Sequence, residues 1–124
     1  MERRVVITGL GVVSPVGTGV EKFWNSLLEG KSGIAPITRF DAADFPVKIA
    51  GEVKDFDPAL AGDKKTIRHM DRNAQFAVAA ARMAVEDAKL DMEKENPDMA
   101  GTLIGTGIGG IHVMEDTILQ IEKR

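Results

Sequence analysis

A glycine-rich run from Gly105 to Gly110, with the sequence GTGIGG, is the sharpest chemical pattern in this chain, because it matches G-x-G-x-x-G. In dinucleotide-binding folds such glycines let backbone amides approach a pyrophosphate at the start of a helix. The acidic residue that would bind the ribose lies about 20 positions further along, past Arg124. Glycines also permit tight turns and positive φ angles, so a purely structural turn is the competing interpretation. The shorter run Gly9-Leu10-Gly11 lacks the third glycine and is interpreted as a structural turn.

A second pattern is a cluster of basic side chains ahead of the expected long helix. Its members fall at helical spacing, so several can share one surface: Lys64, Lys65, Arg68, His69 and Arg72. Such a cluster is usually a solvated helix face. The alternative is a docking surface for an acidic protein, where peripheral charges mainly raise the association rate. Spacing alone favours the solvated face.

The side chains that could act as nucleophiles or metal ligands form no recognisable site. Cysteine is absent, which excludes disulfides, thiolate zinc sites and thiol nucleophiles within the sequence. His69 and His112 have no partner at metal-ligand spacing. Ser14, Ser26 and Ser32 lack the G-x-S-x-G context of an exposed nucleophile. We therefore expect no catalytic residue and no metal site in this chain.

The periodicity of apolar side chains predicts the elements that carry these patterns. Residues 5–8 and 102–104 are apolar on both faces, which is typical of central strands covered on both sides. A capping-box pair, Thr18 and Glu21, predicts a helix over 20–28 that ends at Gly30. Residues 31–60 are interpreted as a loop, a strand over 47–53 and another loop.

Two further helices complete the predicted order. Small residues that recur every three or four positions predict a long helix with a stripe that a neighbouring backbone can approach closely: Ala74, Ala77, Val78, Ala81, Ala84, Val85 and Ala88. The last helix has Ile111, Met114, Ile118 and Ile121 on one face. The alternation of strands and helices predicts an α/β architecture.

Composition narrows the possible partners. The 124 residues carry a net charge of −3, so the chain has no general attraction for nucleic acid or an anionic membrane. The apolar stretch over 5–16 is interrupted by glycine, serine and proline and is shorter than the roughly 20 residues that span a bilayer. We expect a cytoplasmic protein with no membrane insertion.

Several separated motifs, taken together and in order, resemble the opening of the β-ketoacyl-acyl-carrier-protein synthases, closest to the type II elongating class. They are Arg3-Arg4-Val5-Val6-Ile7-Thr8-Gly9-Leu10-Gly11, Ser14-Pro15-Val16-Gly17, Gly33-Ile34, Arg39-Phe40-Asp41, Met70-Asp71-Arg72 and Gly105 to Gly110. The similarity is collinear and covers residues 1–124, so it outweighs one glycine loop. It identifies the chain as the N-terminal part of a β-ketoacyl synthase domain.

The resemblance implies a thiolase-like layered α/β/α/β/α fold, of which this chain is most of the first half, and a homodimer. The family reaction transfers an acyl group from acyl-carrier protein to a cysteine. The enzyme then condenses that group with malonyl-carrier protein, which decarboxylates, and no cofactor is implied. Relatives carry the cysteine and two histidines after the region covered here. We therefore expect the 124-residue polypeptide to be inactive alone, and to be insoluble or molten without the remainder of the fold.

What the resemblance transfers to this chain is binding. Gly107, Ile108 and Gly109 match positions that line and gate the acyl pocket. Lys65 and Arg68 match positions that contact the acidic carrier protein, whereas His69 stands where relatives place a third basic residue. The helix after Gly110 is expected to lie toward the dimer interface. A nucleotide-binding oxidoreductase and a noncatalytic partner subunit of the same fold remain the alternatives.

Overall fold

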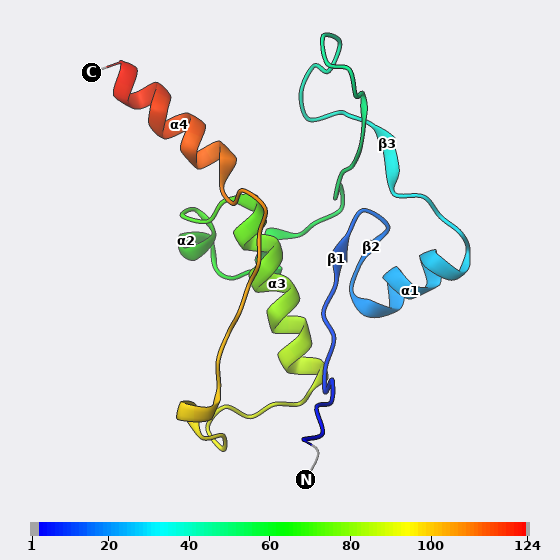
Figure 1. Ribbon diagram of the computed structural model, residues 1–124, viewed down its shortest axis with the longest axis vertical. Helices are drawn as coiled ribbons and strands as arrows, with labels where there is room; N and C mark the ends of the chain where they lie inside the picture. The colour runs from blue at the N-terminus through cyan, green and yellow to red at the C-terminus, as the bar shows by residue number, and fades with distance from the viewer. Residues whose placement is uncertain (1–2, 124) are drawn as a thin grey trace.

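The computed structural model describes residues 3–123 and shows a mixed α/β chain built around one long helix, α3 (Arg72–Asp87), at its centre (Figure 1). The other elements, in chain order, are β1 (Val13–Ser14), β2 (Gly17–Thr18), α1 (Val20–Leu28), β3 (Ile34–Pro36), β4 (Ile49–Gly51), η1 (Pro58–Leu60), α2 (Lys64–Ile67), η2 (Pro97–Met99) and α4 (Ile111–Glu122). The three longer predicted helices are confirmed as α1, α3 and α4.

Helix α1 differs from its sequence prediction at its N-terminus and agrees with it at its C-terminus. The predicted cap Thr18 is wrong, because Thr18 pairs with Val13 in the β1–β2 hairpin and the N-cap is Gly19, at φ 88°. The C-terminus agrees with the prediction: Gly30 adopts φ 65°, and its N–H bonds to the carbonyl of Leu27. The Lys31 N–H then bonds to the carbonyl of Ser26, which completes a Schellman motif.

The N-terminal segment runs along α3 at close range, as the small-residue stripe predicts (Figure 1). A Cβ built on Gly9 would lie 2.2 Å from the carbonyl oxygen of Ala84 and 2.8 Å from the Cβ of Ala88. The same atom on Gly11 would lie 1.9 Å from the carbonyl oxygen of Ala80. Only residues without a side chain allow this backbone-to-backbone contact.

The two predicted central strands are wrong as secondary structure in the described chain. Residues 5–8 and 102–104 are not assigned to strands, and Val5 is 92% and Leu103 99% exposed. A strand that is apolar on both faces is stabilised by neighbouring strands and covering layers, and neither segment pairs with a strand within residues 3–123. The pairing that does form is local and antiparallel, β1 with β2 and β3 with β4.

The region between α1 and α2 contains two short strands where its sequence predicts one. The expected strand over 47–53 shortens to β4, and it pairs with β3, which lies in a stretch interpreted as loop. Beyond this hairpin, Glu52 accepts hydrogen bonds from the Thr38 hydroxyl at 2.6 Å, from the Thr38 N–H at 3.0 Å and from the Arg39 N–H at 3.1 Å. The Glu52 carboxylate therefore links the residues after β3 to the residue after β4 and closes the loop between the two strands.

We expect this closure to depend on pH. The hydrogen bonds from Thr38, its hydroxyl first, hold the pKa of Glu52 below its ordinary value of 4.5. A depressed pKa means that the carboxylate stabilises the folded loop above the unfolded-state pKa, and that this contribution is lost as pH falls through the folded-state pKa. A ¹³C carboxyl titration should place the Glu52 midpoint below 4.5.

The matched variant is Thr38→Val, which removes the hydroxyl donor and keeps the shape of the side chain. The Glu52 midpoint should move upward in that variant. An unchanged midpoint would show that the Thr38 hydroxyl does not control the ionisation of Glu52.

The small core lies where α3 meets the segment that follows β4. Its buried members are Phe56, Ala61 and Ala79, and partly buried Val13, Val53, Phe76, Val78 and Met83 pack against them. Phe56 and Phe76 meet edge to face with ring centroids 4.8 Å apart. The N-terminal half of α3 is thereby fixed, and both candidate binding regions lie next to it.

Candidate functional site

The basic residues predicted to share one surface lie on α2 and the turn that follows it. Asp63 caps α2, its carboxylate accepting the Thr66 N–H at 2.8 Å, and this backbone hydrogen bond lowers the pKa of Asp63. The chain then turns through hydrogen bonds from His69 N–H to the Thr66 carbonyl and from Met70 N–H to the Ile67 carbonyl. Lys65, Arg68 and His69 are all exposed. We call these three residues the basic surface.

Arg72 does not belong to that surface, which corrects the grouping drawn from helical spacing. Asp71 ends the turn and starts a new helix, so the spacing is interrupted and Arg72 points into the core. Its Nη2 donates to the Val53 carbonyl at 2.6 Å, and its guanidinium lies 4.9 Å from the ring centroid of Phe76. Burial lowers the pKa of Arg72. Arg72 therefore holds the β4 segment against α3.

The glycine-rich loop connects an extended segment to α4 and is exposed over most of its length. Gly109 has φ 87° and its N–H bonds to the Thr106 hydroxyl at 3.1 Å. Gly105 and Gly107 would accommodate a Cβ with nothing within 4 Å. The Ile108 side chain is 73% exposed. A positive φ thus explains one glycine of the run, and close packing within the described chain does not explain Gly105 or Gly107.

Gly110 is the loop residue that packs closely against another element. A Cβ on Gly110 would lie 3.0 Å from Oδ2 of Asp71 and 3.3 Å from its Cβ. The structure therefore brings the start of α4 against the N-cap of α3, and the turn that carries the basic surface is continuous with that cap. Sequence reasoning missed this contact, because nothing in the local pattern pairs residue 71 with residue 110.

A cavity of about 280 Å³ lies where these elements meet. Its lining includes Arg39, Glu52, Asp71, Arg72, Phe76, Gly109, Ile111 and His112. Of the three residues expected at an acyl pocket, only Gly109 is part of this lining, whereas Gly107 and Ile108 are not. The described residues thus place the loop at the edge of a cavity without closing a pocket around Ile108.

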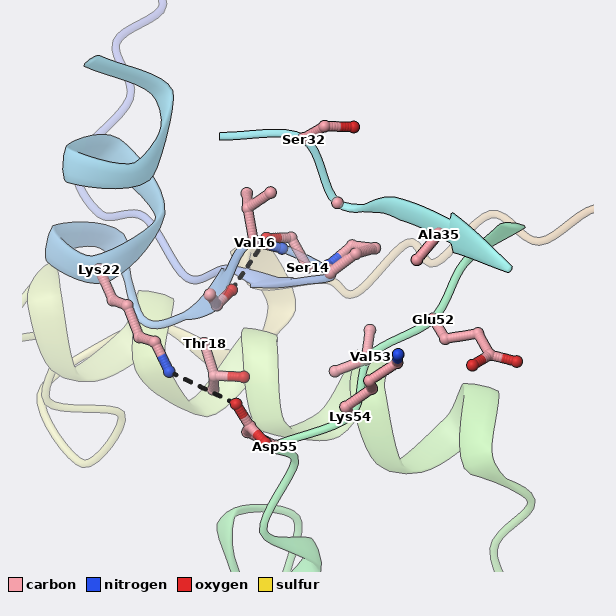
Figure 2. A pocket seen from close by; sticks show the side chains of 13 residues that line it. Ser14, Val16, Thr18, Lys22, Ser32, Ala35, Glu52, Val53, Lys54 and Asp55 are labelled. Carbon is pink, nitrogen blue, oxygen red and sulfur yellow. Dashed lines mark hydrogen bonds and ion pairs between the residues drawn. The ribbon is translucent and has the colours of Figure 1, made fainter. Parts of the chain in front are cut away.

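A second cavity of about 260 Å³ lies between the β1–β2 turn, α1 and the segment after β4 (Figure 2). The Ser14 hydroxyl donates to the Gly17 carbonyl at 2.9 Å, and the buried Ser26 hydroxyl donates to the Val16 carbonyl at 2.8 Å. Lys22 reaches Asp55 at 3.9 Å across the cavity (Figure 2). Both serine hydroxyls are held by backbone carbonyls, so they hold the turn and offer no activated nucleophile.

An apolar groove of about 450 Å³ follows the outer side of α3. Its apolar lining comes from Val78, Ala81, Val85 and Leu90 together with Ile104 of the extended segment. Val78 and Val85 are two helical turns apart, a spacing that could have indicated the groove, but the contribution of Ile104 depends on the path of the chain. No helix within residues 3–123 is long and apolar enough to cross a bilayer.

Comparison with known proteins gives consistent results along the chain. The family profile described as "Beta-ketoacyl synthase, N-terminal domain" matches residues 2–123. A 3-oxoacyl-[acyl-carrier-protein] synthase 2 from Coxiella burnetii is 56% identical over 114 residues, which cover 92% of this chain and 28% of the relative. The protein of the same name from Synechocystis sp. is 50% identical over 115 residues, covering 93% and 28%.

A solved structure agrees with these relatives. "The ishigamide ketosynthase/chain length factor" superposes with a TM-score of 0.78 at 42% identity, over 97% of this chain and 30% of that chain. The chain thus spans about 28% of the length of the curated relatives it matches.

Proposed function

The chain belongs to the β-ketoacyl synthase family, as part of the N-terminal domain, and from this premise we propose that the complete protein elongates fatty acyl chains on acyl-carrier protein. The observation that carries the proposal is the match over residues 2–123, with 56% identity to a 3-oxoacyl-[acyl-carrier-protein] synthase 2. The complete protein would act in the cytoplasm as a homodimer with the layered thiolase-like fold.

The proposed reaction is a decarboxylative Claisen condensation. An enzyme thiolate attacks the acyl thioester, forms an acyl-enzyme and releases the carrier thiol. Malonyl-carrier protein loses CO₂, and the carbanion that remains attacks the acyl-enzyme carbonyl and expels the enzyme thiolate. The thiol and the histidines that stabilise the enolate charge belong to polypeptide outside this segment, since the sequence contains no cysteine.

The role proposed for α2 is carrier-protein docking. Lys65 and Arg68 extend from α2 and its turn into solvent, with no partner among the ion pairs of the described residues. Exposed basic side chains attract an acidic protein mainly by speeding its approach. Each exposed pair contributes roughly 0.2–1 kcal/mol, so binding needs several of them. His69 is exposed beside Lys65 and Arg68, where relatives place a third basic residue.

The role proposed for Gly107, Ile108 and Gly109 is one wall of the acyl pocket. Ile108 is a large apolar side chain at 73% exposure, and in the complete fold it would face the acyl chain from a loop with a flexible backbone. Replacing Ile108 with Phe in the complete enzyme should shorten the longest accepted acyl chain, because the larger ring fills the pocket. The measurement is kcat/KM against acyl-carrier substrates of increasing length.

The matched control for that experiment is Ile108→Leu, which conserves volume and should leave the length profile within about twofold of the parent. An Ile108→Phe enzyme with the parent's length profile would remove Ile108 from the acyl pocket. The proposal for the loop, rather than the proposal for the family reaction, would then be wrong.

The experiment that tests the function itself is elongation by the complete protein. Acyl- and malonyl-carrier proteins should yield a β-ketoacyl product with release of CO₂, and alkylation of the enzyme thiol should abolish it. Saturable binding of a nicotinamide dinucleotide would support the oxidoreductase alternative instead. Carrier-protein binding with no condensation would identify a noncatalytic partner subunit.

A further inference from the structure

Asp71 occupies the junction between the two proposed binding regions. Its Oδ1 accepts the Arg72 N–H at 2.5 Å and caps α3, while its Oδ2 faces Gly110 at the start of α4. Helix α4 has no side-chain cap of its own. A carboxylate beside a helix N-terminus is favourable because the helix dipole is positive there. The Asp71 side chain therefore caps α3 and lies directly beside the start of α4.

The turn that carries the basic surface is firmly attached to this junction. Gln75, one turn into α3, donates from Nε2 to the Met70 carbonyl at 3.0 Å and from its backbone N–H to the Asp71 carbonyl at 3.0 Å. The beginning of α3 is in turn held by Arg72, which bonds to the Val53 carbonyl. On its C-terminal side, α2 is therefore joined to the core through Met70 and Asp71.

The glycine loop is attached to the same junction from the other side. Gly110 packs on Asp71 closely enough that an added Cβ would lie 3.0 Å from Oδ2. Gly109 precedes it at φ 87°, and Ile108 is the next residue toward the N-terminus. The position of Ile108 is thus two peptide units away from the Asp71 contact.

We propose that Asp71 is a positioning residue that couples carrier-protein docking on the basic surface to the placement of Ile108 in the acyl-pocket loop. The inference rests on the proposed function and adds to it. Docking on Lys65 and Arg68 biases the turn through Met70, and Asp71 transmits that bias to Gly110. Length selection of the acyl chain and recognition of the carrier then depend on one carboxylate, although the two regions lie about 40 residues apart in the sequence.

Three substitutions in the complete enzyme separate this role from helix capping. Asp71→Ser keeps a good N-cap for α3 but removes the second oxygen that faces Gly110. Asp71→Asn keeps both the cap and the shape of the side chain. Gly110→Ala leaves Asp71 in place and adds a Cβ within 3.3 Å of it.

Hydrogen exchange of the loop amides is the first readout. Asp71→Ser should speed exchange over residues 106–111 roughly fivefold, whereas Asp71→Asn, which keeps the shape and loses the charge, should fall between the parent and Asp71→Ser. Acyl-carrier protein should alter exchange at this loop in the parent and not in Asp71→Ser. The second readout is the ratio of KM for long and short acyl substrates, which should shift roughly tenfold in Asp71→Ser and Gly110→Ala.

Loop exchange and length selectivity that are unchanged in both Asp71→Ser and Gly110→Ala would overturn the inference. A destabilised Asp71→Ser enzyme would not decide the matter alone, but Gly110→Ala tests the same contact without touching the cap. If the parent shows the exchange effects and does not elongate acyl chains, the proposed function fails while the coupling through Asp71 stands.

Discussion

Replacing Gly11 with alanine is expected to destabilise the complete protein by about 3 kcal/mol or more, the upper range for overpacking a tight contact. The added Cβ would lie 1.9 Å from the carbonyl oxygen of Ala80 and 2.8 Å from the backbone N of Ala84. Both atoms belong to the α3 backbone, so no side-chain rotation relieves the clash. Gly11 has no positive φ, and the strain therefore comes from lack of space alone.

The measurement is the denaturant midpoint of the variant together with its soluble yield. Gly101→Ala is the matched control, because a Cβ there meets nothing within 4 Å in the described chain. A Gly11→Ala protein that unfolds at the parent's midpoint would show that the N-terminal segment does not lie against α3 as described. Loss of stability in both variants would instead indicate that the complete fold also covers Gly101, as proposed for Leu103.

Reversing the charge of the basic surface is expected to weaken the carrier interaction strongly. In a Lys65→Glu, Arg68→Glu double variant, kcat/KM for acyl-carrier protein should fall roughly 10- to 100-fold at low salt, since like charges at an interface repel. Added salt should reduce the difference in kcat/KM between the double variant and the parent, because salt screens exposed charges. Both side chains are exposed, so the stability of the variant should stay near that of the parent.

Two controls show whether the effect depends on where the reversed charges lie or only on the net charge. A Lys48→Glu, Lys89→Glu variant has the same net charge as the double variant, but its exposed positions lie outside the basic surface. It should retain the parent's kcat/KM. An acyl thioester on a small thiol in place of the carrier protein should react equally with all three enzymes. Equal losses in both charge-reversed variants would contradict docking at Lys65 and Arg68.

The exposed apolar side chains acquire a physical explanation from the family assignment. Val5 at 92%, Leu103 at 99% and the α4 residue Ile121 at 67% exposure are unusual for large apolar residues. The apolar groove along α3 leaves a further surface uncovered. In the proposed complete fold, neighbouring strands and helices would cover these surfaces, which is also why variants are best tested in the complete protein.

The sequence by itself determined the features that depend on local periodicity and local geometry. Helices α1, α3 and α4 and the glycine C-cap at Gly30 follow from spacing within one or two helical turns. The close approach of a backbone to α3 was also predictable, because a stripe of small side chains leaves room for a neighbouring backbone. The ordered motifs likewise predicted the family that comparison then identified.

The tertiary structure alone decided everything that depends on a partner distant in sequence. It left residues 5–8 and 102–104 unpaired in the described chain, because a strand forms only beside another strand. It drew Arg72 out of the basic cluster to the Val53 carbonyl and the Phe76 ring. It also placed Asp71 against Gly110. The local spacing of residues specifies a helix or a turn, whereas contacts between residues distant in sequence depend on the path of the chain between them.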